Sequence, residues 1–222
     1  MPTILDIRNE SLAYSATFAR PPLELWGAGG RIIKGLCEAL EPYNISLRNI
    51  HVSPAAATAA DAVIAVQIGS TVLKFSFEKV EATFSGFGED EFRGIPKFLQ
   101  MSTGWLEKQY PFAAHEAWYF CHAFLKGPTV DEFLKNIYPN PIKSAGLDLG
   151  SGGVFYRAVP EKAWTIQLTI DKSQQFPGGL FIGLRLNVAT GLVDYNLLFT
   201  DGRQYLAKAL TDLGLALPEL AG

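Results

Sequence analysis

The chain has 222 residues, of which 48% are hydrophobic and 18% charged, and this composition is typical of a folded protein with a sizeable core. Nineteen lysine and arginine residues against 22 aspartate and glutamate residues give a net charge of −3. The composition excludes a disordered chain, and the charge provides neither a basic surface for nucleic acid nor a polybasic membrane signal. We therefore expect no nucleic-acid partner and no membrane partner.

The cysteines and the first residues bear on the cellular compartment. Cys37 and Cys121 are far apart in the sequence and form no Cys-x-x-Cys pair, so neither a metal site nor a disulfide framework is predicted. Residues 1–6 lack the basic and apolar regions of a secretory leader, and no run of about eighteen apolar residues occurs. We expect a cytoplasmic protein with reduced cysteines.

The first half of the sequence predicts a strand, a helix, three short strands and a second helix. Apolar and polar side chains alternate along residues 12–18, which is the period of a half-buried strand. After a proline pair the apolar spacing changes to i, i+3, i+4 and i+7, which predicts a helix over about residues 23–41. An antiparallel meander follows, and acidic residues 89–91 then favour a helix N-terminus. The strands of this meander are predicted at residues 62–68, 71–77 and 80–84.

The second half predicts a similar series. A strand over residues 115–125 is followed by a short helix over residues 130–137, which Pro139 and Pro141 end. A final helix is indicated by the apolar spacing from Leu206 to Leu213. The strands between these two helices are predicted at residues 154–158, 164–170, 180–188 and 193–199.

Both halves therefore give the order strand, helix, antiparallel meander, helix. We predict an α+β fold with two similar halves, residues 1–110 and 111–222, as an ancient duplication would produce. Two coincidentally similar stretches are the alternative. No Gly/Ser linker occurs near Tyr110 and Pro111, so the halves are expected to share one core or one sheet.

A glycine-rich segment stands out between the short helix and the strands of the second half. Residues 146–153, Gly-Leu-Asp-Leu-Gly-Ser-Gly-Gly, resemble the Asp-Leu-Gly-x-Gly loop of Rossmann-like methyltransferases that bind S-adenosylmethionine. The resemblance implies that Asp171 would hold the ribose hydroxyls. However, the β-prone residues 154–160 follow where a crossover helix should begin, and the remaining chain predicts antiparallel hairpins. We interpret Asp148–Gly153 as a turn before a strand, and we expect no cofactor.

The histidines do not form a catalytic or metal-binding pattern. Cys121 precedes His122, but neighbours on a strand point to opposite faces, so a thiol–imidazole pair is not expected. His122 shares its face with Glu116 and three aromatic residues, whereas His115 lies on the face of Cys121. The sequence contains neither an HExxH nor a Gly-x-Ser-x-Gly motif. We lean towards a protein that is not an enzyme and assign no catalytic, cofactor-binding or metal-binding residues.

Polar side chains of the second meander form the candidate binding surface. They alternate with apolar residues along the predicted strands and so share the face opposite the core. Solvation of a polar sheet face is the ordinary explanation, and a platform of hydrogen-bonding groups for a protein partner is the functional alternative. The residues are Thr165, Gln167, Thr169, Arg185, Asn187, Asp194 and Asn196.

Two main hypotheses of function remain. The first is a non-enzymatic protein that binds a protein partner, or a second copy of itself, through a sheet edge or an aromatic patch. The 15 Phe, 8 Tyr and 4 Trp residues motivate it. The second is a carrier or enzyme for a hydrophobic small molecule held between the sheet and the helix of Phe98, Met101 and Trp105, with Glu116 and His122 as polar groups of the pocket. An S-adenosylmethionine-binding protein is a third, weaker hypothesis.

Overall fold

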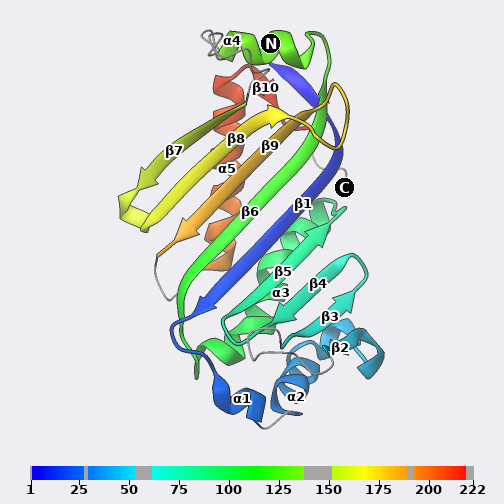
Figure 1. Cartoon of the computed structure of the whole chain (residues 1–222), viewed down its shortest axis with the longest axis vertical. Helices are drawn as coiled ribbons and strands as arrows, with labels where there is room; N and C mark the ends of the chain where they lie inside the picture. The colour runs from blue at the N-terminus through cyan, green and yellow to red at the C-terminus, as the bar shows by residue number, and fades with distance from the viewer. Residues whose placement is uncertain (1, 28–29, 54–61, 138–151, 190–192, 219–222) are drawn as a thin grey trace.

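The computed structural model describes residues 2–27, 30–53, 62–137, 152–189 and 193–218. A ten-stranded sheet forms the body of the molecule (Figure 1), and the mixed α+β class that the sequence predicts is confirmed. The strands are β1 (Thr3–Phe18), β2 (Ile50–Val52), β3 (Ile64–Ile68), β4 (Thr71–Phe75), β5 (Lys79–Ser85), β6 (Phe112–Leu125), β7 (Gly153–Val159), β8 (Trp164–Lys172), β9 (Leu180–Val188) and β10 (Leu215–Ala216). The α-helices are α1 (Leu23–Gly27), α2 (Gly30–Ala39), α3 (Glu89–Glu107), α4 (Val130–Ile137) and α5 (Tyr195–Asp212).

The sheet is continuous from one half of the chain to the other. Its strand order is β2-β3-β4-β5-β1-β6-β9-β8-β7, with antiparallel neighbours throughout, and β10 pairs in parallel with the beginning of β1. The long strands β1 and β6 form the centre and pair from Leu5 opposite Leu125 to Phe18 opposite Phe112. The last meander strand of each half, β5 or β9, lies beside the first strand of that half.

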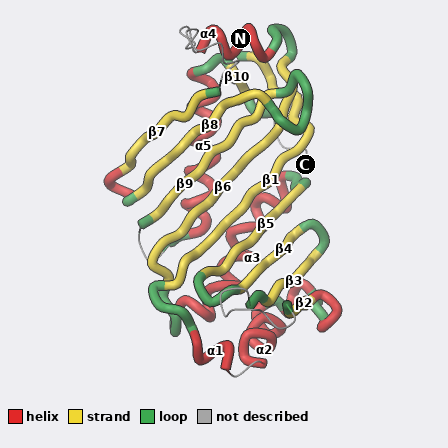
Figure 2. The backbone as a smooth tube through the Cα atoms, viewed as in Figure 1, coloured by secondary structure: helices red, strands yellow, loops and turns green. Residues whose placement is uncertain are grey.

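The helices of the described residues cover one face of this sheet. In Figure 1, α3 and α5 lie behind the strands, whereas α1 and α2 lie at one end and α4 at the other; Figure 2 shows the same arrangement by element type. The alternating residues Leu12, Tyr14, Ala16 and Phe18 of β1 are buried and belong to the hydrophobic core on the helix side. The residues between them, and their partners on neighbouring strands, therefore form a second face that α3 and α5 do not cover.

A chain of buried hydrogen bonds joins the two central strands to the two covering helices. Tyr14 Oη lies 2.7 Å from His115 Nδ1 and 3.1 Å from the hydroxyl of Tyr195, which is 2.8 Å from Thr103 Oγ1. Thr103 donates to the carbonyl of Leu99. One direction of donation, from the imidazole N–H through both tyrosines to Thr103, satisfies every member of the chain. His115 is thus a hydrogen-bonded core residue.

The predicted strand over residues 193–199 is wrong, because α5 begins there. The carboxylate of Asp194 accepts hydrogen bonds from the backbone N–H groups of Asn196 and Leu197 and so caps the helix N-terminus. The second meander consists instead of β7, β8 and β9. The predicted helix over residues 23–41 corresponds to α1 and α2, and residues 28 and 29 between them lie outside the described part.

The other predicted elements correspond to observed ones. The strands of the first meander are confirmed as β3, β4 and β5, and Gly69, at a φ of 56°, forms the first turn. Helix α3 begins at Glu89, so the acidic residues 89–91 form its first turn as predicted, and the helix includes Pro96. Among the helices in the described ranges, none has the length and apolar character needed to cross a bilayer.

Candidate functional site

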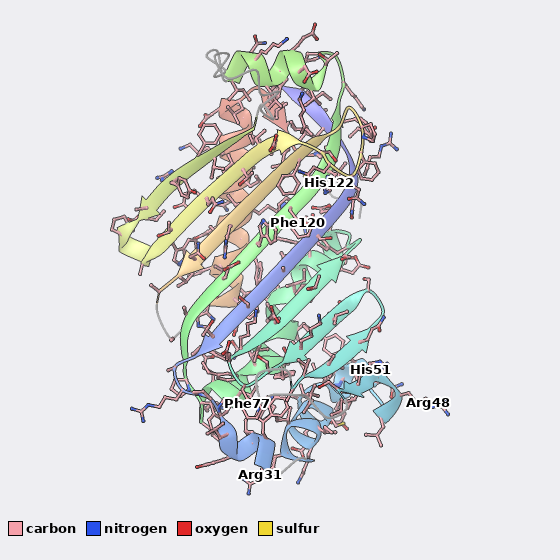
Figure 3. The ribbon with its side chains drawn as sticks, in the orientation of Figure 1. Arg31, Arg48, His51, Phe77, Phe120 and His122 are labelled. Atoms are coloured by element: carbon pink, nitrogen blue, oxygen red, sulfur yellow. The ribbon has the colours of Figure 1, made fainter. Side chains whose placement is uncertain are left out.

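A strip of aromatic side chains crosses the sheet face that α3 and α5 leave uncovered. We call this set the aromatic strip. Every second residue of β6 from Trp118 to Phe124 contributes a ring, and Phe181 of β9 and Phe176 of the β8–β9 turn complete the row. Figure 3 labels two members, Phe120 and His122, along β6 on the near face of the sheet. The members are Trp118, Phe120, His122, Phe124, Phe176 and Phe181.

The rings of the strip contact one another along its length. Ring centroids are 4.8 Å apart for Trp118 and Phe120, 6.5 Å for Phe120 and Phe181, and 5.3 Å for Phe181 and His122. Phe176 lies 5.8 Å from His122 and continues the row to Phe124. Pairs at these separations attract one another and hold each ring in place. The indole of Trp118 is 39% exposed, so the strip is partly open to solvent.

The β8–β9 turn fixes one end of the strip. Ser173 Oγ accepts hydrogen bonds from the backbone N–H groups of Gln175 and Phe176, and it lies 2.8 Å from His122 Nδ1. Because this oxygen already accepts twice, its own hydrogen is free to be donated to His122 Nδ1. Burial also lowers the pKa of His122. Both effects favour a neutral imidazole in the strip.

Five of the seven predicted surface residues lie on the same face, beside the aromatic strip. The register places Thr165 opposite Asn187 and Gln167 opposite Arg185, with Thr169 next along β8. Arg185 is in turn opposite Trp118 on β6, so the polar residues flank the strip directly. The guanidinium of Arg185 donates to the carboxylate of Glu116 at 2.6 Å, which forms an exposed ion pair at this border.

The other two predicted surface residues, Asp194 and Asn196, do not belong to this face. Both lie at the N-terminus of α5, where they line a surface groove of about 610 Å³ with Lys97, Gln100 and Met101 of α3. The prediction placed them on the polar face because it assigned residues 193–199 to a strand. Helix α5 instead puts them behind the sheet.

One cavity between the sheet and α5 has a volume of about 30 Å³, which holds one or two water molecules. Its lining is mainly apolar and includes Leu12, Tyr119 and Phe199. Glu116 and His122, the predicted polar groups of such a pocket, lie on the uncovered face instead. A separate pocket of about 260 Å³ is lined by Phe98 of α3 together with Tyr43 and Phe84, and the second hypothesis stays a prediction.

Three titratable groups, Glu10, Tyr119 and Cys121, lie close together on the helix side of β1 and β6. Tyr119 donates to Glu10 Oε1 at 2.6 Å, and burial raises the pKa of Glu10. Burial also raises the pKa of the Cys121 thiol to about 12, so this thiol stays protonated at neutral pH. Cys121 and His122 lie on opposite faces of β6, as the alternation of the strand predicts. Within the described ranges, no group of three or more His, Cys, Asp or Glu residues could hold a metal ion.

Most of the glycine-rich segment, residues 146–151, lies outside the described residues. Its last residue, Gly153, begins β7, which pairs antiparallel with β8. A strand therefore follows the glycines, whereas the methyltransferase loop opens a helix next to a parallel strand. A β-carbon at Gly152 would overlap the carboxyl group of Asp171, so Asp171 packs closely against this backbone.

No protein-family profile matches the sequence, and no curated protein is significantly similar to it.

Proposed function

We propose that the chain is a non-enzymatic protein that binds a protein partner through the aromatic strip and the polar residues beside it. The observation that carries this proposal is the position of the strip, on the sheet face that α3 and α5 leave uncovered. An antiparallel sheet with one uncovered face ordinarily presents polar side chains there. A row of six rings instead keeps apolar surface in contact with water, which is typical of an interaction site.

The composition of this face supports a protein partner. Trp and Arg are the residues that most often dominate the binding energy of protein interfaces, and Trp118 and Arg185 lie opposite each other on β6 and β9. Threonine hydroxyls and the amides of Gln167 and Asn187 provide a polar rim with donors and acceptors. We assign the apolar contacts with the partner to the strip. The hydrogen bonds of the polar rim would fix the orientation of the partner on this face.

Affinity capture from the native host, followed by calorimetry with the captured protein, tests the proposal. Trp118→Ala removes the most exposed ring of the strip. Because loss of a central aromatic residue costs about 2 kcal/mol or more in a typical hot spot, we expect binding about thirtyfold weaker. Leu197→Ala is the matched control, since Leu197 is 54% exposed but lies on α5, behind the sheet.

Two results would contradict the proposal. Equal affinity of the wild-type and Trp118→Ala proteins would place binding on another surface. If the wild-type protein retains no partner at micromolar concentrations, the proposed binding function is wrong. Circular dichroism spectra of both variants establish that the fold is retained.

We also infer that the two halves arose by duplication of one α+β unit. The repeated element order supports this: each half has a first strand at the sheet centre, then one or two short helices, a meander and a long helix. If residues 1–110 and 111–222 are two such units, the separately produced pieces should associate through β1 and β6. Failure to associate, with each piece folded by itself, would contradict a shared sheet.

A further inference from the structure

The pocket of about 260 Å³ lies on the helix side of the sheet, between the end of β5 and the first turns of α3. We call it the α3 pocket. Two of its rings are buried in the core, whereas Tyr43 is 36% exposed, so the floor of the pocket belongs to the core and its rim to the surface. Four separate segments provide its aromatic side chains: Tyr43 of the 3₁₀ helix Glu41–Tyr43, Phe84 of β5, Phe87 of the β5–α3 connection and Phe98 of α3.

The rings of the α3 pocket stand nearly at right angles to one another. The planes of Tyr43 and Phe98 are inclined by 83° at a centroid distance of 5.2 Å, and those of Phe84 and Phe98 by 86° at 5.7 Å. These contacts of edge with face attract and hold each ring in place. Perpendicular rings also enclose a space, whereas a parallel stack would fill it. Aromatic cages recognise quaternary ammonium groups, because a cation is attracted to the electron-rich faces of the rings.

The lining of the α3 pocket carries a negative charge. Glu91 belongs to the lining, and among the described residues that line the pocket none is basic. Glu91 Oε2 accepts a hydrogen bond from the backbone N–H of Gly88 at 3.0 Å, and a carboxylate has a second oxygen for a further partner. A cation among the rings would therefore find an opposite charge, whereas a phosphate or carboxylate ligand would meet only a like charge.

The first turn of α3 keeps this end of the pocket negative. Glu89 is paired with Arg93 and Arg203, so its charge is largely compensated. The carboxylates of Asp90 and Glu91 then add two negative charges, whereas the helix N-terminus contributes about half a positive charge. The balance favours a bound cation over a bound anion.

Gly94 leaves room in the pocket. It belongs to the lining and lies inside α3, where glycine is less favourable than alanine. A β-carbon at this position would meet no atom within 4 Å, so the packing of the helix does not require a glycine there. The pocket is slightly smaller than the range of about 300–1,000 Å³ that suits drug-sized ligands, and a small ligand fits it best.

We infer that the α3 pocket binds a small free molecule with a trimethylammonium group, of the size and charge of choline. The aromatic rings surround the methyl groups, and Glu91 balances the charge. The hydroxyls of Ser70 and Thr71, which also line the pocket, provide hydrogen bonds for a polar tail. The α3 pocket and the aromatic strip lie on opposite faces of the sheet, so this inference and the proposed function can fail independently.

A titration of the wild-type chain with choline, followed by nuclear magnetic resonance, tests the site. We expect saturable binding with a dissociation constant of about 1 mM or below, and an upfield shift of the choline methyl protons over the ring faces. The neutral analogue with carbon in place of nitrogen has the same shape and should bind about tenfold more weakly. Phosphocholine should also bind more weakly, because its phosphate meets no basic group. Absence of saturable choline binding, or equal binding of either analogue, overturns the inference.

Glu91→Gln tests the role of the charge. Glutamine can still cap the helix, so the substitution removes the charge without removing the cap. We expect choline to bind about fivefold more weakly. Asp90→Asn is the matched control, because it removes the same charge from the same turn at a residue outside the pocket lining, and it should change the affinity by about twofold or less. Wild-type affinity in Glu91→Gln overturns the inference.

Two further variants test the ring at the rim and the space inside. Tyr43→Leu should bind choline about tenfold more weakly, whereas Tyr43→Phe keeps the ring and should bind as the wild type does. Gly94→Leu should fill the pocket and abolish binding, and leucine favours a helix, so α3 should be retained. A Tyr43→Leu protein that is folded by circular dichroism and binds choline normally overturns the inference. Loss of binding in Trp118→Ala alone would place the ammonium group on the aromatic strip and also overturn it.

Discussion

The indole of Trp118 lies over the backbone of Gly183 on the neighbouring strand β9. A β-carbon at position 183 would be 3.2 Å from Trp118 Nε1 and 3.2 Å from Phe181 Cζ, which is closer than such atoms normally approach. Glycine at this position therefore lets two rings of the aromatic strip lie close to the sheet. The shape of the uncovered face depends on a residue without a side chain.

Gly183→Ala should displace Trp118 and Phe181 from the sheet. The added methyl group overfills a packed site, so we expect a loss of about 1 kcal/mol in the free energy of unfolding and a change in near-ultraviolet circular dichroism. Gly94→Ala is the control, because a β-carbon there meets no atom within 4 Å and lies in α3. That substitution should stabilise the protein by up to about 1 kcal/mol. Equal stabilisation by both substitutions would contradict the close approach at Gly183.

Tyr14→Phe should destabilise the core by about 1–3 kcal/mol, because it removes the hydroxyl that bonds to His115 Nδ1 and donates to the hydroxyl of Tyr195. Tyr195→Phe should have a similar cost, since it breaks the same chain of hydroxyl groups. The double substitution should cost less than the two single costs added, and urea unfolding of all four proteins measures this coupling. Additive costs would show that the chain does not act as one network.

His122 should make the protein less stable in mild acid. Its folded-state pKa is below the ordinary value of 6.5, so the unfolded state takes up a proton first as the pH falls. The stability contributed by the neutral imidazole is therefore full above pH 6.5 and is lost as the pH falls from there towards the folded-state pKa. Urea unfolding between pH 5 and 8 measures this loss, and His122→Gln should remove that part of the slope. An unchanged slope in His122→Gln would assign the effect to another group.

Strands with a long, regular alternation could be predicted closely from the sequence. The alternation predicts strands over residues 164–170 and 180–188, and β8 and β9 extend from Trp164 to Lys172 and from Leu180 to Val188. Each of these strands buries one face in the core, so burial enforces the period of two along its whole length. In a short apolar segment, too few residues are buried for the period of two to be distinguished from helical spacing.

The beginning of α5 shows the limit of this signal. Apolar residues alternate over 193–199, which fits a strand, but Tyr195 and Leu198 also have helical spacing. In the structure Leu197 is 54% exposed, so the alternation does not correspond to a buried face. A second local signal for a helix is Asp194, a preferred N-cap residue, directly before this segment.

The aromatic strip could not be assigned to an exposed face from the sequence. Strand β6 carries bulky side chains on both faces, with Tyr119 and Cys121 on one and Trp118 and Phe120 on the other. Which face the helices cover depends on where α3 and α5 pack, and that is a property of the whole fold. Phe176 belongs to the β8–β9 turn and contacts His122. The alternation of residues along β6 cannot predict this contact.

The central position of β1 has a consequence for synthesis of the chain on the ribosome. Leu12 pairs on one side with Phe84 of β5 and on the other with Tyr119 of β6. Strand β1 is therefore synthesised before both of the strands that pair with it. At about 5–20 residues per second, β6 follows β1 by roughly 5–20 s. During that interval one edge of a 16-residue strand has no native partner. Nascent chains stalled before β6 should therefore aggregate more readily than chains released after it.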